Sequence, residues 1–181
     1  MFLRLLVLGG AAAIALSACA TRPPIPRNPA PQGGFVVERD LAGKRTGRGE
    51  FSAINGVKRG FSVALNGIWD GQTLTLVEDY AYDDGETDTK TWTLTRIADG
   101  EWRGTREDVV GEARGFLDGD AFRLEYQVVL PSEDGDGGRQ VGFRDVLIKS
   151  GPDTVYNFAR VGWLGLRVGQ VELEIGPADA G

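Results

Sequence analysis

The sequence predicts an all-β fold, an antiparallel up-and-down β-barrel of about ten strands, with a two-sheet β-sandwich as the alternative. Two observations lead to this prediction. Apolar and polar residues alternate with a period of two along almost the whole chain after residue 35, which is typical of strands with one buried face. Short Asn-Gly and Asp-Gly stretches separate these runs at regular intervals, as hairpin turns do. A meander of this kind hides its edges best by closing on itself.

Four runs show the alternation most clearly: Lys58–Trp69, Thr73–Tyr82, Asp88–Arg96 and Ala121–Leu130. Further strands are expected near residues 47–54, 101–107, 110–118, 140–149, 154–161 and 166–175. No segment shows a convincing helical period, except for a possible turn near Trp163. We therefore expect a lipocalin-like or related barrel.

Glu78 interrupts an apolar strand face. It lies in register with Leu76 and Tyr80, so its side chain should point inward. If Asp84-Gly85-Glu86 is a three-residue hairpin loop, Glu78 faces Trp92 and has Lys90 on its diagonal. A buried carboxylate needs a partner. Glu78 is thus either a polar anchor in a ligand cavity, or part of a structural ion pair or a hydrogen bond to a tyrosine.

Asp145 raises the same two alternatives. It alternates with Phe143 and Leu147, and either Arg160 or Arg144 is a possible partner. The candidate cavity residues are Glu78, Tyr80, Lys90, Trp92, Tyr126 and Asp145.

Composition argues against an enzyme. The chain has no histidine and a single cysteine, Cys19, which excludes Ser-His-Asp and Cys-His catalysis and zinc sites built from those residues. No phosphate-binding glycine motif is present. A hydrolase that uses Glu78 and Asp145 as its two carboxylates stays formally open, but no motif supports it. We expect no enzyme activity, no cofactor and no metal site.

The first residues are typical of a secretory signal. Met1–Arg4 carries one positive charge, and Leu5–Leu16 is an uncharged apolar run that is too short to span a membrane. Leu16-Ser17-Ala18-Cys19 resembles the bacterial lipobox, which implies cleavage before Cys19 and acylation of that residue, with palmitate as one expected chain. By the enteric sorting rule, Ala20 rather than Asp after the cysteine implies the outer membrane. We expect a lipid-anchored protein on the periplasmic face of a Gram-negative outer membrane.

The predicted organisation has three parts: a removed signal peptide (1–18), a lipidated cysteine with a proline-rich tether (19–34), and a single barrel domain (35–181). The whole chain carries 20 basic and 26 acidic residues, and loss of Arg4 with the signal peptide leaves a net charge of −7. This acidic balance argues against nucleic acid as a partner.

One stretch, "WDGQTLTLVEDYAYDDGETDTKTWTLTR", resembles the domain-of-unknown-function 3833 family of proteobacterial lipoproteins. The matching positions are Asp70, Gly71, Leu74, Leu76, Glu78, Tyr80, Tyr82, Asp84, Gly85, Glu86, Lys90 and Trp92. The stretches "EDVVGEARGFLDGDAFRLEYQVVLP" and "NFARVGWLGLRVGQVELEI" are similar to later family segments. The chain departs from the family pattern at Lys90, where an arginine is usual, and around Asp145. The resemblance implies an envelope lipoprotein with a lipocalin-like barrel, and it carries no established activity.

Two functions follow as hypotheses. The first is an anchored barrel that binds an apolar or amphipathic, lipid-like small molecule, with the candidate residues lining its cavity. The second is a structural or assembly lipoprotein that binds an unidentified envelope partner through its surface. Whether the barrel interior is open or filled by side chains separates the two.

Overall fold

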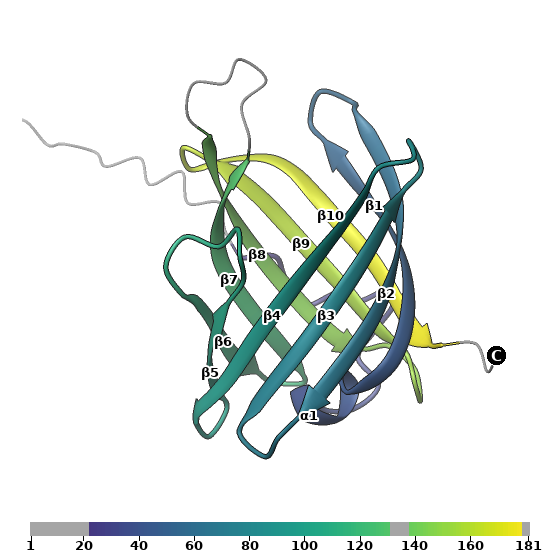
Figure 1. Cartoon of the computed structure of the whole chain (residues 1–181), viewed down its shortest axis with the longest axis vertical. Helices are drawn as coiled ribbons and strands as arrows, with labels where there is room; N and C mark the ends of the chain where they lie inside the picture. Colours follow the sequence, from purple (N-terminus) through teal and green to yellow (C-terminus); the bar gives the residue numbers. More distant parts are fainter. Residues whose placement is uncertain (1–21, 131–137, 179–181) are drawn as a thin grey trace, which may run out of the picture.

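Ten antiparallel strands form one closed barrel in the computed structural model, which describes residues 22–130 and 138–178. Each strand pairs with its neighbours in the chain, and β1 pairs with β10 from Arg45↔Pro177 to Ala53↔Gly169 to close the ring (Figure 1). The predicted up-and-down barrel is confirmed, and the sandwich alternative is wrong. Cys19 and the predicted signal peptide lie outside the described residues.

All ten predicted strands are present. Their bounds are β1 (Gly43–Ala53), β2 (Lys58–Trp69), β3 (Thr73–Tyr82), β4 (Thr87–Ala98), β5 (Glu101–Thr105), β6 (Ala113–Asp118), β7 (Ala121–Leu130), β8 (Arg139–Lys149), β9 (Val155–Trp163) and β10 (Leu166–Pro177). A four-residue helix, α1 (Val37–Asp40), precedes them. No helix in the described ranges has the length and hydropathy needed to cross a membrane.

The predicted register between β3 and β4 is wrong by two residues. The loop is Asp83-Asp84-Gly85, because the Tyr82 amide donates to the Glu86 carbonyl and Gly85 takes the left-handed conformation, with φ +89°. Glu78 therefore pairs with Lys90 rather than with Trp92. Because the error is an even number of residues, every side chain keeps its predicted face.

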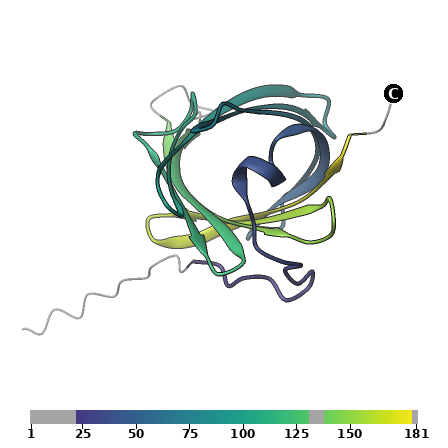
Figure 2. The same cartoon turned by 90° about the horizontal axis from the view of Figure 1, so that it is seen from below.

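One end of the barrel is closed by the chain that leads into β1. Figure 2 shows α1 across this end, which we call the closed end. Phe35, Val37 and Leu41 are buried there, and the Phe35 ring stacks on Phe122 with centroids 5.9 Å apart. The opposite end carries the β1–β2, β3–β4 and β9–β10 turns, and we call it the mouth (Figure 1).

The segment before α1 lies along the outer wall of the barrel (Figure 2). Ile25 packs on the buried outward-facing cluster Ala121, Val146 and Ile148. The Arg123 guanidinium donates to the Pro23 carbonyl at 2.6 Å, and the Gln32 amide donates to the Lys149 carbonyl at 2.7 Å. The described part of the predicted tether, residues 22–34, is thus packed on the barrel, because these strands present an apolar outer face for it to cover.

Candidate functional site: a polar cluster inside the barrel

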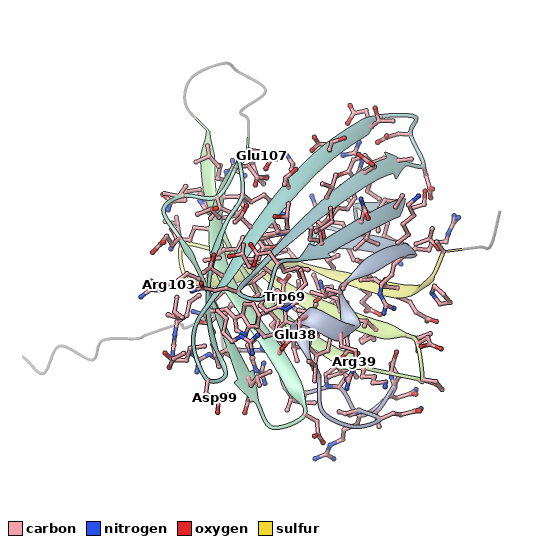
Figure 3. All side chains as sticks on the ribbon, turned by 60° about the horizontal axis from the view of Figure 1, so that its bottom comes forward. Glu38, Arg39, Trp69, Asp99, Arg103 and Glu107 are labelled. Carbon is pink, nitrogen blue, oxygen red and sulfur yellow. The ribbon has the colours of Figure 1, made fainter. Side chains whose placement is uncertain are left out.

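The barrel interior is apolar at the closed end. Leu74, Leu94, Trp102 and Phe122 are almost fully buried there. Trp69 lies at the edge of this layer, where Arg96 covers its ring at 5.0 Å and pairs with Glu38 of α1 at 3.3 Å (Figure 3). Burial of this layer supplies the hydrophobic core that the fold requires.

A polar cluster lies in the interior between the closed end and the mouth. We call it the central cluster and define it as Glu78, Tyr80, Arg106, Asp108, Tyr126, Asp145 and Asn157. Glu78 on β3 is 8% exposed, and the Tyr80 hydroxyl donates to its Oε2 at 3.0 Å. The Arg106 Nη1 lies 3.9 Å from the same Oε2.

Arg106 follows β5 and links the carboxylates to the aromatic residues. Its Nε and Nη2 donate to the two Asp108 carboxylate oxygens at 2.7 and 3.3 Å. Its guanidinium carbon lies 4.7 Å from the ring centroid of Trp92 and 5.3 Å from that of Tyr126. Arg106 is therefore held on several sides, by an ion pair and by cation–π contacts.

Asp145 on β8 forms the second half of the cluster and is 6% exposed. Its Oδ2 accepts from the Tyr126 hydroxyl at 3.5 Å and from Asn157 Nδ2 at 3.4 Å, both long contacts. Asp145 Oδ1 and Asn157 Oδ1 are buried and find no hydrogen-bond partner among the described residues. Buried acceptors of this kind are rare and require an explanation.

Both buried carboxyl groups are hard to ionise. Burial raises the pKa of Glu78 to about 7, against the opposing effects of Arg106 and the Tyr80 hydrogen bond. Burial raises the pKa of Asp145 to about 7 as well, although the Asn157 hydrogen bond and Arg106 favour its charged form. Neighbouring protein groups therefore leave part of the charge of these carboxylates uncompensated.

The mouth side of the cluster is walled by apolar side chains. Val128, Val141 and Val161 are buried, and Phe51, Phe143 and Val171 pack against them. These last three face the interior but are only half-buried, so solvent reaches the barrel wall at this level. The interior thus offers an apolar surface that leads from the mouth to polar groups.

The structure places all six predicted cavity residues on the inner face. Glu78 and Tyr80 form one pair, and Tyr126 and Asp145 form another. Trp92 meets the Tyr126 ring edge-on, with centroids 5.0 Å apart. A role of these residues in ligand binding stays a prediction.

The predicted charge partners are not the ones that the structure shows. Lys90 faces Glu78 across the strands, but its amino group lies by Asp88 at 3.0 Å and Asp108 at 3.6 Å, and the cation near Glu78 is Arg106. Asp145 has Tyr126 and Asn157 as its partners. Because side chains alternate along a strand, Arg144 and Arg160 lie on the outer face, where they line a hollow of about 400 Å³.

Arg106 and Asn157 belong to the site but are absent from the predicted set. The alternation of inward and outward side chains that predicted the inward direction of Glu78 also predicts it for these two residues. Arg106 continues the inward series of Trp102 and Gly104, and Asn157 lies between Val155 and Ala159. Asp108 lies in the β5–β6 loop, where periodicity gives no indication of side-chain direction.

Metal chemistry finds no support in the part of the chain that the structure describes. It contains no group of three or more acidic, cysteine or histidine residues that could hold an ion. Two hollows, the one beside Arg144 and one of about 370 Å³ beside Tyr156, lie on the outer wall.

The fold and the cluster define an up-and-down barrel with polar groups in its interior, an architecture that in other proteins encloses a small ligand. An S-type phycobiliprotein lyase (CPES) from Guillardia theta has a similar fold, with a TM-score of 0.58 and 10% sequence identity over 88% of this chain and 99% of that chain. At this identity the likeness shows the fold alone, and it agrees with the predicted lipocalin-like barrel. No curated protein sequence matches this chain.

The chain belongs to the family described as protein of unknown function (DUF3833), whose model matches residues 13–176. The predicted family is thereby confirmed. That the protein is a lipoprotein, and that it is not an enzyme, stay predictions.

Proposed function

We propose that this protein is a lipid-anchored envelope protein that binds an apolar or amphipathic small molecule inside its barrel. One observation carries the proposal: the central cluster holds two buried carboxylates, of which Asp145 has an oxygen without a hydrogen-bond partner among the described residues, and half-buried apolar side chains lead to them from the mouth. A barrel that needed only stability would fill this space with apolar residues, as the closed end does.

Native mass spectrometry of protein purified from its host membranes tests the proposal. The expected result is a co-purified non-covalent mass beyond that of the acylated chain. In parallel, the fluorophore N-phenyl-1-naphthylamine should bind saturably to protein stripped of that ligand. If no mass co-purifies and the probe does not bind, the binding function is wrong and the surface-partner alternative is favoured.

Two adjacent residues of β10 provide a matched pair of variants. Val171 faces the interior on the mouth side, and Gln170 faces outward. Val171→Trp should fill the path to the cluster and abolish binding of the probe, whereas Gln170→Trp should leave it unchanged. Equal binding by both variants, with folding confirmed by circular dichroism, would place the probe outside the barrel.

The proposed anchoring rests on the lipobox-like sequence at Cys19. Metabolic labelling with a palmitate analogue should label the wild-type protein and leave Cys19→Ser unlabelled. The wild-type protein should also band with the outer membrane on a density gradient. Normal membrane fractionation of Cys19→Ser would contradict the anchor.

A further inference from the structure

The charges around the central cluster do not balance. Four carboxylates lie in or beside it, those of Glu78, Asp88, Asp108 and Asp145, and the basic groups that contact them are Arg106 and Lys90. Arg106 is engaged by Asp108, and Lys90 lies between Asp88 and Asp108. The carboxylate farthest from a cation is that of Asp145, whose hydrogen bonds come from a tyrosine and an amide.

The buried acceptor atoms that lack a hydrogen bond lie at the same place as the carboxylate that lacks a positively charged partner. Asp145 Oδ1 and Asn157 Oδ1 are both acceptors, both buried, and both without a donor within the described ranges. They belong to adjacent strands and to side chains that are joined by a 3.4 Å hydrogen bond. A single group that carries several N–H donors and a positive charge would satisfy both oxygens and compensate the carboxylate.

We infer that the molecule bound in the barrel is an amphipathic amine, whose ammonium group is held by Asp145 and Asn157 while its apolar part lies along the mouth-side wall. The inference rests on the proposed binding function and names its ligand class. An anionic head group fits poorly, because it would meet Glu78 and Asp145 while Arg106 is already paired. A neutral head group would leave the Asp145 charge uncompensated.

Three single-chain probes with the same tail test the head group. Dodecylamine, dodecanol and dodecanoate are each titrated at pH 8 against the complex of the full-length protein with N-phenyl-1-naphthylamine. We expect dodecylamine to displace the fluorophore at a concentration at least tenfold lower than the other two. In Asp145→Asn that preference should disappear. Asp99→Asn serves as the control, because Asp99 is an exposed residue in the β4–β5 turn (Figure 3). This variant should keep the preference for dodecylamine.

The pH dependence of the wild-type protein provides a test that needs no variant. The groups that face Asp145 are Tyr126 from β7, Asn157 from β9, Arg106 from the β5–β6 connection and Glu78 from β3. Because burial raises the pKa of Asp145 to about 7, the carboxylate gains its charge as the pH rises through that value, while an alkylamine stays protonated. Dodecylamine affinity should therefore increase between pH 5.5 and 8, by up to about tenfold per unit below pH 7.

The possible results separate the inference from the function on which it rests. Equal affinity for the three head groups, as expected if a buried water bonds to the two oxygens, overturns the amine and leaves the binding function standing. A preference for dodecanoate also overturns the amine and leaves the binding function standing. Failure of all three probes to displace the fluorophore overturns the binding function itself.

Discussion

The two ends of the barrel interior are built by the same ten strands but filled differently. At the closed end Phe35 stacks on Phe122 and Trp102 meets Phe122 edge-on, and leucines complete this closed-end aromatic cluster. Between that end and the mouth, the same inward-facing positions carry Glu78 and Asp145. Packing at the closed end lowers the free energy of the folded state, whereas the buried carboxylates raise it at neutral pH.

The two levels separate the residues that stabilise the fold from those that we propose to bind a ligand. Groups that cost stability and have incomplete partners are found where a barrel of this class would hold a ligand. Among the described residues the closed end shows no such group, because its buried carboxylate, Asp40, pairs with Arg39 at 2.7 Å and accepts from the Val36 amide. Arg96 and Glu38 pair at the edge of the apolar layer. Substitutions at the two levels should therefore change the free energy of unfolding by different amounts, with a different pH dependence and with a different sign.

The largest effect is expected from Phe122→Ala at the closed end. Phe122 is fully buried between Phe35 and Trp102, so its truncation should lower the free energy of unfolding by about 3–5 kcal/mol in urea denaturation. Phe143→Ala, which removes a half-buried ring stacked on Tyr126 near the mouth, should cost clearly less. Equal losses would show that the two levels are packed alike.

Asp145→Asn should have an effect of opposite sign. The folded-state pKa of Asp145 is raised from 3.8 to about 7, so the folded protein binds the proton more tightly than the unfolded chain. The Asp145 contribution to stability is then fully present below about pH 4 and is lost as the pH rises to about 7. Asn does not titrate, so the variant should be more stable than the wild type at pH 8 by up to about 4 kcal/mol.

The measurement for this variant is chemical denaturation at pH 5 and pH 8. The stability difference from the wild type should grow with pH, while Asp99→Asn should show no such trend. A variant that is less stable than the wild type at pH 8 would mean that the Asp145 carboxylate is well compensated in the folded protein.

A smaller loss is expected from Gly115→Ala. A Cβ on Gly115 would lie 2.7 Å from Cζ of Phe122 and 2.9 Å from Cβ of Trp102 in the closed-end aromatic cluster. Overpacking of this kind costs about 1–3 kcal/mol, which thermal unfolding would detect. Gly176→Ala on β10 meets no atom within 4 Å and should be tolerated. A tolerated Gly115→Ala would indicate that the closed end is loosely packed.

The smallest effect belongs to the outer face. Lys58 and Glu50 pair at 2.8 Å at a largely exposed site near the mouth. Lys58→Ala should change the free energy of unfolding only slightly, and less again at high salt. A larger change would show that surface ion pairs, and not only the packing of the barrel interior, contribute substantially to the stability of this fold.

The strands could be predicted because alternation and turn chemistry are local. The ten runs and the inward direction of Glu78 and Asp145 follow from residue order alone. The β3–β4 register could not be fixed, because Asp83-Asp84-Gly85 and Asp84-Gly85-Glu86 are both acceptable loops and both keep Leu76 inside. The charge partners of the buried carboxylates were harder to predict than the strands or their register. Arg106 reaches Glu78 from the β5–β6 connection, and that contact depends on the curvature of the closed barrel rather than on sequence spacing.

The packing of residues 22–34 on the wall also escaped prediction. Prolines and glycines in this segment predict an extended tether, and in the structure residues 22–34 form neither helix nor strand. What its composition does not reveal is the apolar outer face of β7 and β8, where Val146 and Ile148 need a cover. The outward-facing apolar residues of β7 and β8 form one continuous surface only when the two strands pair in the barrel.

Two tryptophan indoles report on the two levels and allow the most direct test. Trp92 contacts Arg106 and Tyr126 in the centre of the barrel, and Trp102 contacts Phe122 in the closed-end aromatic cluster. In ¹H–¹⁵N spectra of the full-length protein titrated with dodecylamine at pH 8, the indole signal of Trp92 should shift saturably and that of Trp102 should stay in place. Shifts at Trp102 with none at Trp92, or no saturable shift at either, would contradict a ligand site in the central cluster.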